Sequence, residues 1–188
     1  MPHALIPLLF FLSQPFWETK TPDQWTLDEI YAIQQKSPWV QSVGQDPAVV
    51  VYLATAAPLE QAESELRRRS KNALRRPDPE YADFLQENRD KIFVLSIAWP
   101  HPQEIGTVAQ RKKMEDESLL VIGHTKYKIV GHFLPVPTDP VLRLVFPREV
   151  KPTDKNFTIR LYLPGINFPE RDVQFWTRDL MYHGKLEL

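Results

Sequence analysis

The sequence predicts an α+β fold in which short helices of the N-terminal half pack on a largely antiparallel, β-sandwich-like sheet formed mainly by the C-terminal half. Two observations lead to this prediction. Helix-start signals concentrate in the first half of the chain, whereas the second half holds a series of short apolar runs with strand patterning. In addition, 18 prolines against 6 glycines divide the chain into short elements, because proline cannot donate a hydrogen bond to a helix or a central sheet ladder.

The composition indicates one folded domain over residues 15–188. Hydrophobic residues make up 43% and charged residues 25% of the 188-residue chain, which is close to the averages of globular proteins. The two proline-containing connectors of the second half, Pro135–Pro140 and Pro147–Asn156, are neither long nor rich in serine and glycine. They therefore read as stiff loops rather than linkers between domains.

Residues 1–14 are predicted to be a signal peptide. Ala4–Leu12 is a run of nine nearly pure apolar residues followed by a polar pair, which matches the central region of a secretory signal. It is too short to cross a bilayer, which takes about 20 apolar residues. We therefore expect a periplasmic or secreted protein that begins near Phe16 and has no transmembrane span. Because no Lys or Arg precedes the run and no clear cleavage site follows it, an N-terminal strand or helix of a cytoplasmic protein is the alternative.

The first helix is predicted over Leu27–Lys36. Thr26 and Glu29 have the spacing of a capping box, in which each side chain binds the backbone amide of the other. Pro38 ends the helix because it disfavours helical geometry at Ser37. Trp25 and Trp39 flank this segment and are expected to clamp it to the body of the protein.

Two more helices are predicted before the middle of the chain. One begins at Pro58, whose fixed backbone suits a first helical turn, and ends with Arg67, Arg68 and Arg69 at its negative dipole end. The other begins at Asp78-Pro79. Its inward face is predicted to carry Tyr81, Phe84 and Leu85.

Two buried strands are predicted in the same half. Ala48–Ala54 is β-branched and continuously apolar, which is typical of a strand covered on both faces near the centre of a sheet. Ile92–Trp99 is predicted to be a second buried strand.

The second half reads as β-rich after one short helix that a capping box at Thr107 and Gln110 introduces. In Phe157–Leu163 the odd positions are apolar and the even positions are more polar, which is the pattern of a strand with one face on the core. The predicted strands of this half are Leu119–Gly123, Tyr127–Leu134, Val141–Phe146, Phe157–Leu163, Val173–Arg178 and Lys185–Leu188.

The chain carries no recognisable reaction motif. It has no Gly-x-Ser-x-Gly elbow, no phosphate-binding glycine loop and no His-Glu-x-x-His helix, and it contains no cysteine. These absences disfavour the standard designs for acyl transfer, phosphoryl transfer and thiolate chemistry. We therefore predict no catalytic residue, no cofactor-binding residue and no cofactor.

The histidines give the nearest approach to a metal pattern. His124 and His132 each follow a glycine and are eight residues apart, and His183 is a third candidate ligand. If the two segments paired as a hairpin, the imidazoles would meet and leave a coordination position open to water. The spacing is not a recognised zinc pattern, so two exposed histidines at strand ends are the alternative interpretation.

A cluster of cations is a candidate binding surface. It consists of Arg67, Arg68, Arg69, Lys71, Arg75 and Arg76. Such a patch suits a phosphate, an anionic lipid or a nucleic acid. The alternative is a solvated helix end balanced by Glu60, Glu63 and Glu65 one turn earlier. With a formal net charge of −1, the chain has no overall attraction to polyanions, so no nucleic-acid partner is expected.

Trp176 is the aromatic residue that we most expect to be exposed. It shares a strand face with Arg178 and Gln174, opposite to Val173 and Phe175. Trp176 and Arg178 are therefore the second candidate binding surface, although most aromatic residues of the chain are expected in the core.

Two stretches resemble uncharacterised exported proteins of acidobacterial type. They are Trp25-Thr-Leu-Asp-Glu-Ile30 leading to Ser37-Pro-Trp39, and Arg178-Asp-Leu-Met-Tyr-His-Gly-Lys-Leu-Glu-Leu188. Those proteins pair such a helix with a β-rich C-terminal half that ends in a Gly-Lys-Leu-Glu-Leu strand. The resemblance implies export, and it implies no known activity or catalytic residue.

These observations favour a noncatalytic extracytoplasmic protein that binds another protein or a cell-envelope component. One alternative is a metal-assisted enzyme of unfamiliar design that uses His124 and His132. A second is binding of nucleic acid or an anionic surface through the cations of residues 67–76. The oligomeric state does not follow from the sequence.

Overall fold

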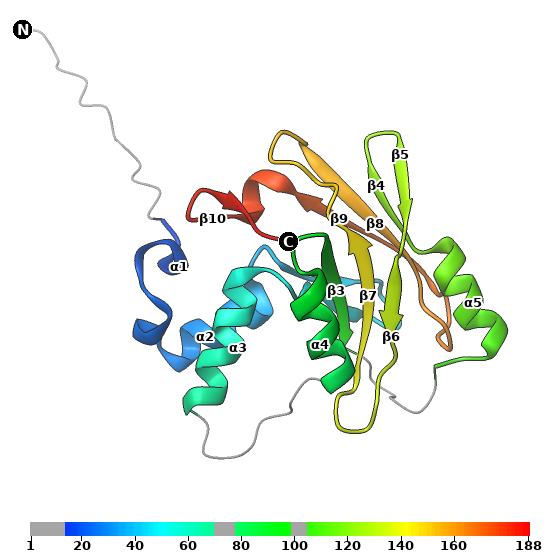
Figure 1. The fold of residues 1–188 in the computed structure, drawn as a ribbon, viewed down its shortest axis with the longest axis horizontal. Coiled ribbons are helices and arrows are strands. Elements are labelled where there is room, and N and C mark those ends of the chain that lie inside the picture. Colours follow the sequence, from blue (N-terminus) through cyan, green and yellow to red (C-terminus); the bar gives the residue numbers. More distant parts are fainter. Residues whose placement is uncertain (1–13, 70–77, 99–104) are drawn as a thin grey trace, which may run out of the picture.

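A computed structural model describes residues 14–69, 78–98 and 105–188 and has the predicted α+β fold (Figure 1). The helices are α1 (Phe16–Thr19), η1 (Pro22–Gln24), α2 (Leu27–Lys36), α3 (Ala57–Arg69), α4 (Pro79–Asn88), α5 (Val108–Glu117) and η2 (Thr177–Leu180). The strands are β1 (Val40–Val43), β2 (Val49–Leu53), β3 (Ile92–Ala98), β4 (Leu119–Ile122), β5 (Thr125–Lys128), β6 (Gly131–Phe133), β7 (Val141–Pro147), β8 (Asn156–Tyr162), β9 (Glu170–Trp176), β10 (Met181–Tyr182) and β11 (Lys185–Leu186).

The described strands form two larger antiparallel sheets and one small one. The first sheet has the order β1-β2-β3-β7-β6, the second has the order β5-β4-β8-β9, and β10 and β11 form a two-stranded ribbon. The second half of the chain supplies the whole second sheet, whereas β1 and β2 of the first sheet come from the first half and β3 spans the middle of the chain. The C-terminal half thus contributes most strands, as predicted.

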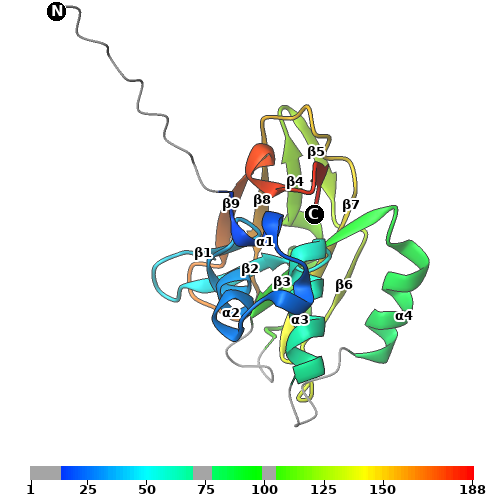
Figure 2. The ribbon, with the colours of Figure 1, turned by 90° about the vertical axis from the view of Figure 1, so that its left-hand side faces the viewer.

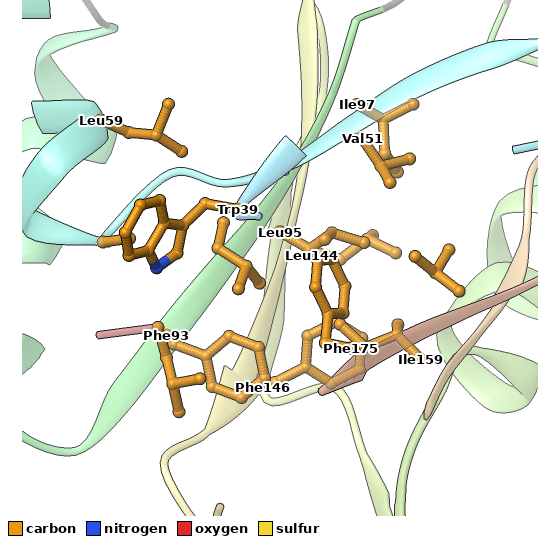
Figure 3. Packing of buried hydrophobic residues seen from close by; sticks show 14 of the residues in the cluster. Trp39, Val51, Leu59, Phe93, Leu95, Ile97, Leu144, Phe146, Ile159 and Phe175 are labelled. Carbon is orange, nitrogen blue, oxygen red and sulfur yellow. The ribbon is translucent and has the colours of Figure 1, made fainter. Parts of the chain in front are cut away.

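The main core lies between the two larger sheets (Figure 3). Phe93 of β3 stacks on Phe146 of β7 with ring centroids 5.6 Å apart. Phe93 and Phe157 of β8 meet edge to face with ring centroids 6.1 Å apart. Phe157 in turn stacks on Phe175 of β9 at 5.3 Å. Because alternate residues of each strand point to opposite faces, these four rings join the inner faces of both sheets into one apolar cluster.

Trp39 joins the N-terminal helices to the end of the chain. Its ring is fully buried, and its Nε1–H donates to the Glu187 carbonyl at 3.0 Å. The Glu187 carboxylate also accepts a hydrogen bond from the Ala57 amide in the first turn of α3, at 3.2 Å. Helices α1, α2 and α3 gather on the side that faces the viewer in Figure 2. Ile30 and Ile33 of α2 are buried, so this face of the helix lies on the core. The predicted clamping role of this tryptophan thus agrees with its position.

A second, smaller apolar cluster holds α4 on the outer face of the first sheet. Tyr81 of α4 is buried against Val94 of β3 and Val145 of β7, with Ile92 beside them. The rings of Tyr81 and Phe84 meet Phe133 of β6 at 5.2 and 5.3 Å. The inward face predicted for this helix is therefore correct.

The structure corrects the prediction for Ala48–Ala54. Strand β2 is second in its sheet rather than central, and its residues alternate between buried and exposed, with Val50 43% exposed. The central strand is β3, which is buried on both faces except at its last residue. A continuous run of valines has no period, so it cannot show that one face of the strand lies in solvent.

The predicted strand Tyr127–Leu134 is wrong because the chain changes sheets within it. Strand β5 pairs with β4 in the second sheet, whereas β6 pairs with β7 in the first. The Val130 amide already donates to the Val145 carbonyl at 2.8 Å, so the crossing is complete before Gly131. Uniform apolar and polar alternation does not reveal which strand a residue pairs with.

Smaller differences concern the ends of elements. Helix α5 ends at Glu117, and Ser118 separates it from β4, so it stops before the strand at Leu119 as expected. Strand β9 begins at Glu170 and ends at Trp176, where η2 follows instead of Arg178 continuing the strand. Strands β1 and β10 were not predicted.

The predicted signal peptide, residues 1–14, lies outside the described residues except for Gln14. Among the helices of the described residues, none is long and apolar enough to span a membrane.

Candidate functional site

A polar row crosses the outer face of the first sheet. The register aligns Tyr52 of β2 with Ser96 of β3, Ser96 with Arg143 of β7, and Arg143 with Phe133 of β6. Residues directly opposite one another on neighbouring strands share a face. The opposite face of the same strands carries the main core, so this row turns three polar side chains away from it.

Helix α4 covers the Phe133 end of this row. It begins with Asp78, whose carboxylate accepts from the Glu80 amide at 2.8 Å, and with Pro79, whose backbone suits a first turn. This start places the Tyr81 ring over Arg143, with the guanidinium carbon 4.2 Å from the ring centroid. A cation in this position is attracted to the face of the ring. The Tyr52 and Ser96 end of the row faces a pocket instead.

Asp139 holds the Arg143 guanidinium in a bidentate ion pair. The two contacts are 2.9 Å and 3.1 Å, and both residues are buried. Asp139 also accepts from the Asp78 amide at 3.2 Å, which ties the start of α4 to the loop before β7. Burial disfavours the charged form of Arg143, but the hydrogen bonds and charge of Asp139 outweigh this effect and raise the pKa of the arginine.

The pocket between α3, α4 and this sheet face has a volume of about 720 Å³. Its floor includes Tyr52, Ser96 and Arg143, and its apolar walls include Leu59 of α3 and Leu85 of α4. In Figure 1, α4 lies between α3 and the ribbons of β3 and β7. The remaining lining residues are Gln34, Ala54, Glu60, Glu63, Arg67, Ala82, Gln86, Arg89, Asp139 and Val141, together with Tyr81.

Ion pairs link the charged residues of the pocket wall. Arg89, the residue that follows α4, donates to both carboxylate oxygens of Glu60 on α3, at 2.5 and 2.7 Å. Arg67 and Glu63, one turn apart on α3, approach to 3.3 Å. The first pair links the end of α4 to α3 at one end of the pocket.

Partial removal from water shifts the proton affinities of these groups. The Glu63 side chain is 48% exposed, but the part of it that is buried raises the pKa of its carboxyl, and the charges of Arg67 and Arg143 oppose the shift. Burial also raises the pKa of the Tyr52 and Tyr81 hydroxyls. In each case the low polarity of the surroundings penalises the charged form.

Two buried polar atoms at the pocket floor lack hydrogen-bond partners among the described residues. They are Arg143 Nε and Ser96 Oγ, in residues that are 7% and 0% exposed. A buried donor without a partner costs roughly 1–3 kcal/mol. Both atoms are fully covered by protein, so they do not face a ligand in the pocket.

The predicted metal candidates lie in separate parts of the fold. His124 is in the turn between β4 and β5, whereas His132 is on β6 of the other sheet, opposite Leu144. The hairpin that a metal site would need between their segments does not form, because β5 pairs with β4 and β6 pairs with β7. His132 Nδ1 lies 3.6 Å from a Glu115 oxygen, and His183 Nδ1 lies 3.5 Å from Glu18. Among the residues described, no three potential metal ligands gather at one point.

The described part of the cation cluster is engaged within the chain. Arg67 pairs with Glu63, and Arg68 pairs with Glu65 at 2.7 Å. Arg69 pairs with the same Glu65 and also donates to the carbonyls of residues 22, 23 and 25. These contacts agree with the balanced helix end that was the alternative interpretation. Lys71, Arg75 and Arg76 lie outside the described residues.

Trp176 is on the outer face of the second sheet and is 37% exposed, as its strand pattern predicts. Lys155 Nζ and the Arg178 guanidinium carbon lie 5.5 and 5.6 Å from its ring centroid. A second pocket of about 460 Å³ adjoins these three residues. The two cations already neighbour the Trp176 ring. None of the residues that line this second pocket is buried, so this pocket offers a ligand fewer directed contacts than the larger pocket does.

Of the residues that line the larger pocket, sequence reasoning placed only Arg67 in a candidate binding surface, and that surface was of a different kind. The available signal was Arg143 in the apolar strand Val141–Pro147, because a charged residue inside such a strand needs a buried partner. Tyr52 and Ser96 gave no signal, since only the strand register brings them beside Arg143. Comparison of the chain with protein-family models, curated proteins and solved structures found no match.

Proposed function

We propose that this chain is a noncatalytic binding protein whose ligand is a small organic molecule held in the pocket between α3, α4 and the outer face of the first sheet. The carrying observation is the pocket itself, whose lining combines the apolar side chains of Leu59 and Leu85 with the polar side chains of Tyr52 and Arg143. With a volume of about 720 Å³, it has the features of a ligand site: a concave shape, an apolar wall and a few polar groups.

The proposal retains the binding role expected from the absence of reaction motifs. It replaces the protein or envelope partner expected there with a small molecule, because the pocket is concave and of ligand size. The extracytoplasmic location stays a prediction from residues 1–14.

A substitution at the rim of the pocket tests the proposal. Ala82 and Asp83 are neighbouring exposed residues on α4, and only Ala82 lines the pocket. Ala82→Trp places a large ring at the pocket, whereas the matched control Asp83→Trp adds the same ring outside it. Because the altered residues are exposed, both variants should fold.

The readout is the set of backbone amide signals in nuclear magnetic resonance spectra of the full chain. Benzamide, benzoate and benzamidine, added separately at millimolar concentration, serve as probes. We expect at least one of them to shift the amide signals of Tyr52, Ser96 and Arg143 in the unchanged protein and in Asp83→Trp, but not in Ala82→Trp. The proposal fails if no probe shifts these signals or if Ala82→Trp leaves the shifts unchanged.

A further inference from the structure

We infer that the β8–β9 loop and the adjoining start of α5 form a surface that docks on lipid bilayers with anionic headgroups. This surface, which we call the loop tip, consists of the apolar residues Val108 and Phe168 and the cations Arg111, Lys112 and Lys113. None of these residues lines the pocket of the proposed function. The inference therefore concerns a different surface and does not depend on that function.

Phe168 is an exposed aromatic residue in a backbone conformation that its side chain disfavours. Its φ is 50°, and a positive φ is a genuine outlier for a bulky residue. The residue is 78% exposed, so contacts of its ring with the core do not offset the strain. Residues held in such conformations gather at functional sites. A strained and exposed ring therefore points to a partner outside the chain.

The loop that carries Phe168 is anchored to the body of the protein. The Leu163 amide donates to the Pro169 carbonyl at 3.0 Å, which closes the loop. Ile166, between these two residues, packs against the main core. Phe168 thus projects from an ordered loop and keeps a fixed place on the surface.

A second exposed apolar residue lies at the same end of the molecule. Gly106 is so close to the loop that a Cβ on it would lie 2.9 Å from both the Gly165 amide nitrogen and Pro164 Cβ. Val108 follows two residues later, at the first position of α5, and is 74% exposed. The loop tip therefore presents two apolar side chains, those of Val108 and Phe168, to solvent.

Three consecutive cations of α5 supply positive charge beside these side chains. Arg111 donates to the Gly106 carbonyl at 2.9 Å, which holds it near the loop. Among the described residues, no carboxylate pairs with Arg111 or Lys112, and Lys113 approaches that of Glu117 to 3.8 Å. The charges of Arg111 and Lys112 are thus available to an anion outside the described part of the chain.

The order of charges along α5 is the reverse of the order that stabilises a helix. The helix dipole favours acidic residues near the start and basic residues near the end. In α5 the three cations lie in the first half, and Glu115, Asp116 and Glu117 form the last turn. Helix stability therefore does not account for this arrangement, whereas attraction to an anionic surface does.

A lipid surface is the partner that matches this combination. Proteins that lie at a membrane interface bury apolar side chains at the headgroup boundary and attract anionic lipids through nearby lysine and arginine. The loop Pro164–Pro169 contains no charged residue that would oppose insertion of Phe168, and Glu170 follows it at the start of β9. The apolar and cationic parts of the loop tip supply the two contributions together.

Substitutions in the full chain test the inference by sedimentation with vesicles of equal amounts of phosphatidylcholine and phosphatidylglycerol. Asparagine adopts positive φ more readily than phenylalanine, so Phe168→Asn should fold and be at least as stable as the unchanged protein. We expect Phe168→Asn to weaken binding at least about fivefold and Lys112→Gln to weaken it about fivefold. Vesicles of phosphatidylcholine alone should bind the unchanged protein less tightly than the anionic vesicles do.

Matched controls come from α2, which lies on the opposite side of the molecule from α5 in Figure 1. Leu27→Asn and Lys36→Gln make the same kinds of change at exposed residues and should leave the affinity unchanged. Every variant keeps residues 1–14, so binding through their apolar run is common to all of them.

A second measurement locates the contact. Bicelles of the anionic mixture that contain a nitroxide-labelled phospholipid should broaden the amide signals of Val108 and Phe168 in nuclear magnetic resonance spectra. The inference is wrong if these signals stay sharp, or if Phe168→Asn and Lys112→Gln bind the vesicles as tightly as the controls. Either result would leave a protein rather than a membrane as the partner of the loop tip.

Discussion

The guanidinium carbon of Arg143 lies 4.2 Å from the centroid of the Tyr81 ring. This contact joins the outer face of β7 to α4, and it puts an aromatic face on one side of a cation whose terminal nitrogens bind Asp139. The charge of Arg143 is thus compensated from two directions in a position that is 7% exposed. The stability of the α4 side of the molecule and the shape of the pocket depend on the same arginine.

Asp139→Asn should destabilise the protein by about 3 kcal/mol, because it leaves the buried Arg143 charge without its carboxylate. The asparagine oxygen can still accept the Asp78 amide, so the charge is the main change. Urea unfolding of the variant and the unchanged protein measures the difference. Asp172→Asn is the control, since it breaks an exposed pair with Arg160 at 3.0 Å and should cost less than about 1 kcal/mol. Equal losses in the two variants would contradict the compensation of a buried charge.

Glu63 and Glu65 should change the pH dependence of stability in opposite directions. Burial raises the pKa of Glu63 above its ordinary value of 4.5. At pH values between the ordinary pKa and the raised pKa, the native state therefore binds more protons than the unfolded chain. The free energy of unfolding contributed by Glu63 therefore falls as the pH rises through this window. Glu63→Gln removes the fall, and the variant should gain stability relative to the unchanged protein, by less than about 1 kcal/mol, between about pH 4 and about pH 7.

Glu65 on the same helix is the matched comparison. Hydrogen bonds from Arg68 and Arg69 lower its pKa, with Arg68 the larger cause. Its contribution is present above the ordinary carboxyl pKa and is lost as the pH falls through the lowered one. Glu65→Gln should therefore destabilise the protein at about pH 7, and the difference should shrink toward acid pH. Urea unfolding at several pH values measures the free energy of unfolding of both variants relative to the unchanged protein. If this difference changed with pH in the same direction for Glu63→Gln and Glu65→Gln, the assigned pKa shifts would be wrong.

Neighbouring residues of β9 should differ sharply in their effect on stability. Phe175 is 1% exposed in the stacked core, whereas Trp176 points outward. Phe175→Ala should cost about 4 kcal/mol, because it removes buried contacts and leaves a cavity. Trp176→Ala should cost about 1 kcal/mol, mainly through lost contacts with Lys155 and Arg178. Chemical denaturation compares the two, and a larger loss for Trp176→Ala would contradict the orientation of β9.

His124→Ala and His132→Ala should leave the metal content of the protein unchanged. The two residues belong to different sheets, and no three potential ligands converge among the described residues. The measurement is elemental analysis after incubation with Zn²⁺ and dialysis. A stoichiometric metal ion that either variant loses would support the metal-assisted enzyme instead.

Export should remove the residues before Phe16 and leave Phe16 and Trp17 in place. The Phe16 ring lies 6.3 Å from Trp25 and the Trp17 ring 6.0 Å from Trp39, so both aromatic residues belong to the folded body. We expect N-terminal sequencing of the extracytoplasmic fraction to begin at or shortly before Phe16. Intact Met1 on cytosolic protein would contradict the predicted signal peptide.

The sequence by itself determined where several elements begin and which face of them is buried. The capping boxes at Thr26 and Thr107 form as predicted, with hydrogen bonds from the Glu29 and Gln110 amides. Phe157, Ile159 and Leu161 of β8 are buried as their alternation predicts. These features depend on interactions between residues a few positions apart, so the local sequence contains the information they require.

Only the tertiary structure decided which strands pair, and with that the candidate site. The register that brings Tyr52, Ser96 and Arg143 together joins residues up to 91 positions apart. The crossing of the chain between sheets at Ile129 and Val130 likewise depends on the position of β7. Periodicity describes the two faces of a strand but not its neighbour, because pairing is selected by packing of the whole core. The pocket therefore depends on the pairing of strands that are distant in the sequence, and local patterns do not predict this pairing.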